Sequence, residues 1–565
     1  MSTVRLGRLG RPGWAGYGVL LAAALVVGLV GLPLARLVAI LVSAGTGPLR
    51  RVVTAPGFGS AVAHSLEVAL AVTAIAVCGG AAAALATARP GTPGRRWLRV
   101  AVLLPLLVPQ FVLGYSWTQA YGRSGFSDQV LGVTLPGLFG PAGVIVVTAV
   151  NVLPLAYLVV AASLSARAEP DLVRAARAAG ADAVTAFRTV TLPLLRAPLG
   201  AAAALVFVTA LESFAVPAVL GIPAGFATMT TRIYSDLALA SDPDSFTDAI
   251  TLSLALVLVA VIVLVPADRL FGVRGRPIRS GGSAGAVPTR KPGRSAWLAT
   301  AALWAYLAVA VGLPLVALVL ASITRAVGLT PVPSNWTLAN FSQALSGPTV
   351  PALLRSLLLA LAAASILVAA GGLVAALERR RFGRSLPTIV MLAFALPGSA
   401  LAVGMLLAYG RWLRDTLLLI LLACLAKLWP FGHRPISGAV DRLPPDDLRA
   451  ARVSGARTIT AIRTVVLRPL SPALAGAWLL IFLVVLHELT MSSLLYGPSS
   501  ETLAVVVLNQ QQLGDVGVTA ALAVLLGLLL VVAALPLLVW SRVRRSSGAR
   551  RHAPVRAEAG VSGAA

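Results

Sequence analysis

Charged residues are scarce in this 565-residue chain: they make up 12% of it, against about 25% in soluble domains. So few charges cannot cover the surface of a soluble protein of this length. Hydrophobic residues make up 58%, and the mean hydropathy is +0.89. The sequence therefore predicts an all-α integral membrane protein, with lipid as its surroundings.

Cysteine and lysine are almost absent. Cys78 and Cys424 are the only cysteines and both lie in apolar segments, which excludes a disulfide framework. Lys291 and Lys427 are the only lysines, and neither completes the phosphate-binding pattern G-x-x-x-x-G-K-[ST]. The four histidines are scattered, and no metal-ligand or nucleophile motif is found. We therefore expect no catalytic residue, no metal and no cofactor bound by the chain itself.

The net charge of +26 raises the question of nucleic acid as a partner. The basic residues lie in short runs between apolar segments, as charges that flank membrane spans do. No basic face interleaved with aromatic residues is present, so we exclude a nucleic-acid partner.

Long apolar runs are abundant, and a membrane span needs about 20 such residues. Twelve runs qualify, at about 17–43, 60–87, 97–121, 141–166, 197–221, 247–267, 296–321, 353–378, 386–410, 415–440, 473–496 and 516–540. Arginine-rich stretches fall at alternate loops, so all lie on one side, which the positive-inside rule makes cytoplasmic. The sequence predicts a multi-pass protein of the cell membrane with both termini in the cytoplasm.

The pattern divides the chain into two six-helix halves. The stretch 269–295 is rich in Gly, Pro, Ser and Arg, and is typical of a flexible linker. The predicted parts are a tail 1–16, a first half 17–268 with a loop at 167–196, the linker 269–295, a second half 296–542 with a loop at 442–470, and a disordered tail 543–565.

The two loops repeat each other at an offset of 275 residues. Residues 171–193 read DLVRAARAAGADAVTAFRTVTLP, and residues 446–468 read DDLRAARVSGARTITAIRTVVLR. Each loop predicts a short helix that begins with acidic residues, a glycine, and a second short helix. A compact helical turn with a smooth alanine face can seat in a groove on a partner and transmit movement.

The two segments resemble the EAA loop of ABC importer permeases, of the form E-A-A, three residues, Gly, nine residues, Ile-x-Leu-Pro. The matching positions are Arg174, Ala175, Ala176, Gly180, Val190, Leu192 and Pro193, and then Arg449, Ala450, Ala451, Gly455, Val465 and Leu467. Arg174 and Arg449 replace the leading Glu, and Arg468 replaces the second closing proline. These departures put a particular contact of the Glu with the ATPase in doubt, and leave the docking role in place.

Segments 211–237, 335–345 and 487–505 are similar to ferric-iron uptake permeases, and a fused pair of halves fits the iron-type and thiamine-type group. The resemblance implies two fused permease domains of the type I importer. It also implies an ABC ATPase dimer that uses ATP and magnesium, and an extracytoplasmic binding protein. Ferric iron is the expected cargo, with thiamine, a polyamine or a phosphonate as alternatives. An ion-coupled secondary transporter is less favoured, because paired EAA-like loops have no role in it. A membrane-embedded enzyme is less favoured, because it would need paired catalytic groups near one face and the sequence has no convincing pair.

Four polar residues are predicted inside spans, where a charge costs about 2.5–3.5 kcal/mol to insert. Glu212 and Glu488 each follow the loop proline by nineteen residues, counted from Pro193 and Pro469. Asn151 and Lys427 align in the fourth and tenth spans. These residues either line a pathway that attracts a cation or hold helices together, and we expect Lys427 to pair with Glu488.

Overall fold

The computed structural model describes residues 24–25, 27–45, 47, 50, 53–54, 57–89, 91–166, 169–240, 242–271, 293–378, 396–444 and 446–551. Within these ranges every regular element is a helix, and the only extended pairing is an isolated bridge between Thr324 and Trp336. The predicted all-α membrane fold is therefore confirmed.

Nine helical stretches of the described residues are long and apolar enough to cross a membrane. They contain α4 (Phe58–Ala88), α9 (Pro141–Ala166), α11 (Ala183–Ala186) with α12 (Leu192–Leu211), α14 (Pro243–Phe271), α15 (Arg294–Leu307) with α16 (Leu313–Ile323), α18 (Thr349–Leu377), α21 (Leu417–Val440), α23 (Thr458–Ala461) with α24 (Arg468–Leu486), and α27 (Val516–Arg551).

Shorter helices complete the bundle and its loops. They are α2 (Leu32–Ala44), α5 (Arg95–Ala101), α6 (Leu104–Leu107), α7 (Gln110–Tyr121), α8 (Phe126–Leu131), α10 (Glu169–Ala178), α13 (Met229–Tyr234), α17 (Ala339–Ala344), α20 (Gly398–Leu413), α22 (Asp447–Val453), α25 (Ser492–Leu495) and α26 (Leu503–Gln512).

Three predicted spans differ from the structure in a way that matters for the site. The span expected at 97–121 bends by 96° near Pro109, between the pair α5–α6 and the pair α7–α8. The spans expected at 197–221 and 473–496 end early, at Leu211 and Leu486. Apolar runs continue past these ends, so hydropathy alone could not detect the breaks. Part of the span expected at 386–410 lies outside the described residues.

Each half has a three-helix core of the same design. In the first half α4, α9 and α12 pack on one another, and in the second half α18, α21 and α24 do so. Gly80 lets α4 approach α9, since a Cβ there would lie 2.7 Å from the Tyr157 nitrogen. Gly371 has the same role between α18 and α21, where a Cβ would lie 2.5 Å from the Gly432 carbonyl carbon. Small residues at such crossings are typical of membrane helix pairs.

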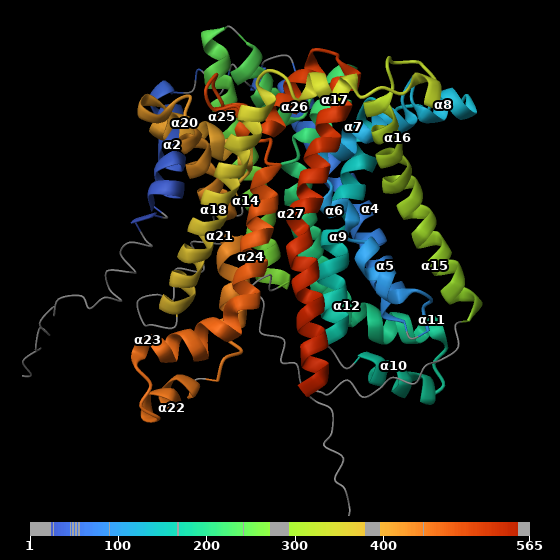
Figure 1. Ribbon diagram of the computed structural model, residues 1–565, viewed down its shortest axis with the longest axis vertical. Helices are drawn as coiled ribbons and strands as arrows, with labels where there is room; N and C mark the ends of the chain where they lie inside the picture. The colour runs from blue at the N-terminus through green and yellow to red at the C-terminus, as the bar shows by residue number, and fades with distance from the viewer. Residues whose placement is uncertain are drawn as a thin grey trace, which may run out of the picture.

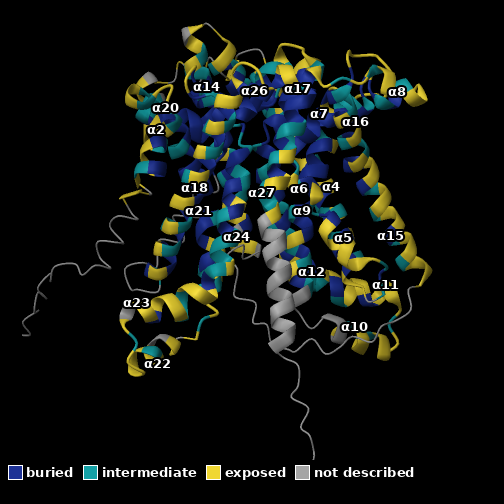
Figure 2. Ribbon diagram, viewed as in Figure 1, coloured by how far each residue is buried: buried dark blue, intermediate teal, exposed yellow. Residues whose placement is uncertain are grey.

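The halves exchange contacts through their outer helices. Helix α20 of the second half packs on α2 and α14 of the first, while α7 of the first half packs on α16 and α27 of the second. One hydrophobic cluster accordingly contains residues of both halves, for example Val112 and Val505. Figure 2 shows that burial is concentrated toward the end of the molecule opposite α10 and α22. At the other end, α10 and α11 lie apart from α22 and α23 (Figure 1).

Aromatic side chains fasten the exchanged helices at two short π-helical turns, η1 (Val27–Gly31) and η6 (Ala308–Gly312). The Tyr409 hydroxyl donates to the Gly28 carbonyl at 2.7 Å, and the Tyr121 hydroxyl donates to the Val309 carbonyl at 2.6 Å. Gly28 and Val309 hold the same place in their turns. A π-turn leaves a carbonyl poorly satisfied, and an aromatic donor from the other half satisfies it where lipid cannot.

Candidate functional site

The two predicted docking loops have one backbone geometry. After α10, the Gly180 amide donates to the Arg177 carbonyl and the Ala181 amide to the Ala176 carbonyl, while Gly180 has φ +92°. These bonds form a Schellman cap, in which the amide that follows the glycine bonds to the carbonyl four positions before the glycine. The spacing from Ala176 to Gly180 is therefore the length of one helix end.

The second loop repeats this cap bond for bond. Gly455 donates to the Arg452 carbonyl, Ala456 donates to the Ala451 carbonyl, and Gly455 has φ +83°. Glycine is required at both places because a side chain is strained at positive φ. A helix, a left-handed glycine and a second short helix thus form each loop, as the repeat predicts.

The matched positions also share their exposure. Ala175 and Ala450 are exposed, whereas Ala176 and Ala451 are half-buried. Both arginines at the leading position are exposed, and Arg449 lies 3.4 Å from Asp446 in an open surface pair that contributes little stability. The remaining motif residues continue into α12 and α24, with Val190, Val465 and Pro193 half-buried and Leu192 and Leu467 exposed.

Sequence reasoning missed the exposed apolar side chains of these loops. Val184 is 55% exposed and its counterpart Ile459 is 80% exposed, while Phe187 and Ile462 are each 40% exposed. Each pair obeys the same offset of 275 residues, so the repeat contained the signal. Exposed apolar side chains of this kind are common on surfaces that bind a partner.

The two loops differ in one helix-capping residue. Asp182 begins α11, and its carboxylate accepts a 2.8 Å bond from the Thr185 amide. Hydrogen bonds from Thr185 lower the pKa of Asp182 below its usual value. The corresponding residue in the second loop is Arg457, which cannot cap a helix start, so the second loop lacks this bond.

The second part of the candidate site lies where α12 and α24 end. Helix α12 is about 30 Å long, so Glu212, which follows its last residue, lies well above the docking loop. The Glu212 carboxylate accepts a bond of 2.6 Å from the Lys427 amine, and the two side chains are 18% and 10% exposed. Lys427 belongs to α21 of the second half, so this ion pair joins the two halves.

The expected pairing of Lys427 with Glu488 is therefore wrong. Glu488 accepts bonds from the backbone amides of Met491 and Ser492, at 2.7 and 2.9 Å, and from the Ser492 hydroxyl at 2.9 Å. The carboxylate thus ties the chain that follows α24 to its own half. The physical reason is the early end of the helix, which leaves amides free beside Glu488.

Asn151 and Lys427 occupy equivalent places in the two halves, and each donates to backbone carbonyls. The Asn151 amide donates to the carbonyls of Pro105 and Val108, where the third span of the first half bends. Lys427 donates to the Leu396 carbonyl at 2.7 Å, just before α20. Both side chains therefore donate to backbone carbonyls of their own half, and only Lys427 adds a charge.

A second equivalent pair distinguishes the halves near the loop end of the cores. Glu378 caps α18 and accepts bonds from His433, at 2.8 Å, and from Ser437, both on α21. In the first half, Thr87 on α4 donates to the hydroxyl of Tyr157 on α9 at 3.3 Å. The second half thus has an ionisable contact where the first has a neutral one.

Two stretches of the chain, residues 75–279 and 367–545, match the family profile described as "Binding-protein-dependent transport system inner membrane component". Together the two matches cover more than half of the chain and one docking loop each. The chain belongs to this family. It is therefore a multi-pass transport permease, a membrane subunit without enzymatic activity of its own.

Curated relatives of this permease cover both halves. It is 27% identical to a probable ABC transporter permease protein, y4fN, of Sinorhizobium fredii, over 74% of this chain and 76% of that one. It is 24% identical to the Fe(3+)-transport system permease protein FbpB 2 of Haemophilus influenzae, over 86% and 91%. A molybdenum transport system permease protein, ModB, of Mycobacterium tuberculosis is 32% identical over 38% of this chain and 80% of its own.

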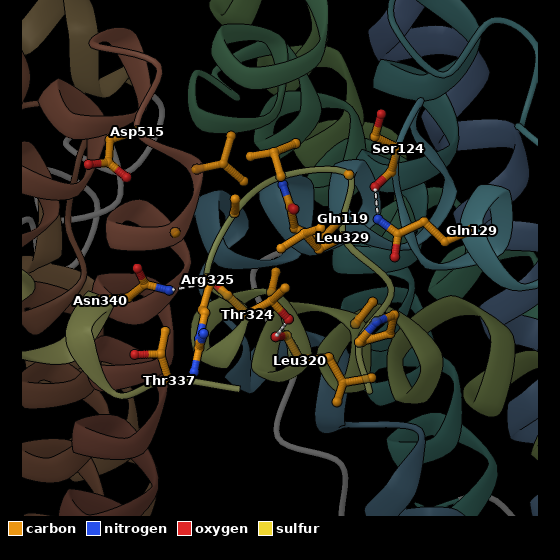
Figure 3. A pocket seen from close by; sticks show the side chains of 18 of the residues that line it. Gln119, Ser124, Gln129, Leu320, Thr324, Arg325, Leu329, Thr337, Asn340 and Asp515 are labelled. Carbon is orange, nitrogen blue, oxygen red and sulfur yellow. Dashed lines mark hydrogen bonds between the residues drawn. The ribbon is translucent and has the colours of Figure 1, made fainter. Parts of the chain in front are cut away.

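The permease also has a cavity of about 570 Å³, lined by both polar and apolar side chains, at the end away from the docking loops. It lies between the two halves, with Gln119 and Gln129 on one side and Arg325, Asn340 and Asp515 on the other (Figure 3). Among the described residues, no three His, Cys, Asp or Glu side chains lie close enough to hold a metal ion, there or elsewhere.

Proposed function

We propose that this permease forms the whole membrane-spanning part of an ATP-driven importer. The duplicated docking loop carries the proposal: two loops of one backbone geometry lie at the same end of a single chain. An ATPase dimer with two equivalent grooves would receive one loop in each groove. ATP and magnesium would be bound by that dimer and not by this chain.

The proposal fixes an orientation. The docking loops, with their arginine-rich surroundings, face the cytoplasm together with both termini, as the positive-inside rule expects. An extracytoplasmic binding protein then meets the opposite end. The halves pack together there, and the cavity of about 570 Å³ lies at that end. Cargo passes between the halves, near the broken helix ends at Leu211 and Leu486.

Ferric iron is the cargo that we propose first. Relatives named as ferric transport permeases match this chain across both halves, including one of Actinobacillus pleuropneumoniae at 23% identity over 74% of this chain and 62% of its own. Support from the acidic residues is weaker than the sequence indicates, because Lys427 neutralises Glu212 and backbone amides hold Glu488.

An oxyanion is the second candidate cargo, because Lys427 places an ammonium group between the two halves. Glu212 neutralises this group, so it would favour negative charge only in a state in which the ion pair is open. Relatives named for molybdenum and for 2-aminoethylphosphonate transport match 38% and 34% of the chain.

Proteoliposomes provide the test. The permease is combined with the ATPase and binding protein encoded beside it, and ATP hydrolysis is measured against ferric iron, molybdate, phosphonate, thiamine and polyamine. Stimulation by loaded binding protein alone supports an importer and identifies the cargo. An absence of ATPase binding under every condition would overturn the proposal. Ala176→Glu with Ala451→Glu should abolish stimulation, and full stimulation in that variant would contradict the docking assignment.

A further inference from the structure

The ion pair between Glu212 and Lys427 is the point where charge crosses from one half to the other inside the membrane. Glu212 follows α12 of the first half, and Lys427 lies on α21 of the second. We propose that Lys427 is a tethered counter-ion, which neutralises Glu212 while no cargo is in transit and separates from it when the halves move apart. This inference rests on the proposed importer function and adds a gating role for one lysine.

The two partners belong to different packing units. Helix α12 packs on α4 and α9, whereas α21 packs on α18 and α24. Rigid-body movement of one three-helix core against the other therefore changes the distance between Glu212 and Lys427 before it disturbs either core. An interaction within one half would not respond in this way.

Lys427 keeps a second partner when the pair opens. Its amine also donates to the Leu396 carbonyl at 2.7 Å, and Leu396 belongs to the second half. The ammonium group therefore stays on the second half as the halves separate. Among the described residues, Lys427 is the only basic side chain on the Glu212 carboxylate, so separation leaves a negative charge on the first half.

The counterparts of Glu212 and Lys427 in the repeat each bond within one half. Glu488, equivalent to Glu212, is held by amides of its own half. Asn151, equivalent to Lys427, is neutral and donates to carbonyls of its own half. The contact between Glu212 and Lys427 thus carries charge between the halves, whereas its counterparts Glu488 and Asn151 each bond within their own half.

The chain contains its own control for this lysine. Lys427→Asn gives the second half the residue that the first half has at position 151. The asparagine can still donate to the Leu396 carbonyl but has no charge to pair with Glu212. We expect the ATPase bound to this variant to hydrolyse ATP several-fold faster without cargo than the ATPase bound to wild type, because the closed state loses its contact. Exchange of the charges, Glu212→Lys with Lys427→Glu, should restore the low rate.

State-dependent cross-linking decides the question. In a C78A/C424A background, the pair E212C/K427C is treated with a short bifunctional thiol reagent, first without nucleotide and then trapped with ATP, vanadate and loaded binding protein. We expect at least a fivefold loss of cross-link on trapping. Equal yields in both states would overturn the inference, as would an unchanged cargo-free rate in Lys427→Asn.

Co-purification of the ATPase, measured on the same samples, separates this inference from the proposed function. If the ATPase does not co-purify, the importer proposal fails. If it does, and cross-linking is independent of state, the importer proposal stands and the gating role of Lys427 fails.

Discussion

Two glutamates at equivalent positions in the repeat have different partners. Glu212 reaches a lysine of the other half, whereas Glu488 accepts three hydrogen bonds from residues that follow it by three and four positions. The same residue type therefore connects the halves in one place and secures a turn in the other.

This difference predicts unequal effects of one substitution. Glu488→Gln replaces an acceptor of charge-assisted bonds by a neutral amide, so we expect a loss of about 1.5–3 kcal/mol of stability. The midpoint of thermal unfolding in detergent measures it. Glu67→Gln is the matched control, because Glu67 is exposed on α4. Equal midpoints for the two variants would contradict the role assigned to Glu488.

Sequence offsets identified Glu212, Glu488, Asn151 and Lys427 as two equivalent pairs, but not which residues touch. The expected contact between Lys427 and Glu488 assumed that each half closes on itself. The chain instead breaks two apolar runs at Leu211 and Leu486 and places α21 against the first half. Hydropathy does not reveal a helix end inside an apolar run, so this contact could not be predicted from composition.

At the scale of elements, the docking loops were the most predictable part of the molecule. Their spacing reflects a local rule. In a Schellman cap the left-handed residue lies four positions after the residue whose carbonyl accepts the longer of the two cap bonds. Local rules are contained in a short stretch of sequence, whereas the exchanged packing of α7 and α20 depends on residues hundreds of positions apart.

The caps give a second prediction. Gly180→Ala and Gly455→Ala each force a side chain into positive φ, which costs about 1–2 kcal/mol. We expect faster hydrogen exchange in the loop and weaker binding of the ATPase. Gly438→Ala in α21 is the control, because no atom lies within 4 Å of a Cβ there. Unchanged exchange in both loop variants would show that the caps do not hold the loops.

The contact between α18 and α21 gives a third prediction. Glu378→Thr leaves His433 and Ser437 without their acceptor, and His433→Tyr removes one of the two donors to Glu378, so we expect each to destabilise the permease by about 1–3 kcal/mol. The double variant recreates the Thr87 and Tyr157 pair of the first half and should recover much of this loss. A double-mutant cycle from unfolding midpoints measures the coupling. Purely additive losses would show that the two residues do not act together.

At the scale of the whole molecule, the two halves of the sequence are not the two units of packing. Helices α2 and α14 of the first half lie on α20, and helices α16 and α27 of the second lie on α7. The bonds from Tyr121 and Tyr409 fasten these exchanged helices at equivalent places. The covalent connection between the halves is therefore one link among many contacts.

A split chain tests this arrangement. Residues 1–282 and 283–565, expressed together as separate chains, should co-purify as a complex, because the exchanged helices hold each half to the other. Tyr409→Phe together with Tyr121→Phe removes two bonds worth about 0.6 kcal/mol each and should lower the yield of complex. The first fragment is tagged and the second is detected in the eluate. Failure of the unmodified fragments to associate would contradict the exchanged packing.

The bond from Tyr409 to Gly28 also has a consequence for synthesis, because the two residues are 381 positions apart. Ribosomes add about 5–20 residues per second, so Gly28 enters the membrane roughly 20–80 s before its donor exists. During that interval the carbonyl must be satisfied by the insertion machinery or by water. The bond that fixes the first helix can therefore form only after much of the second half has been made.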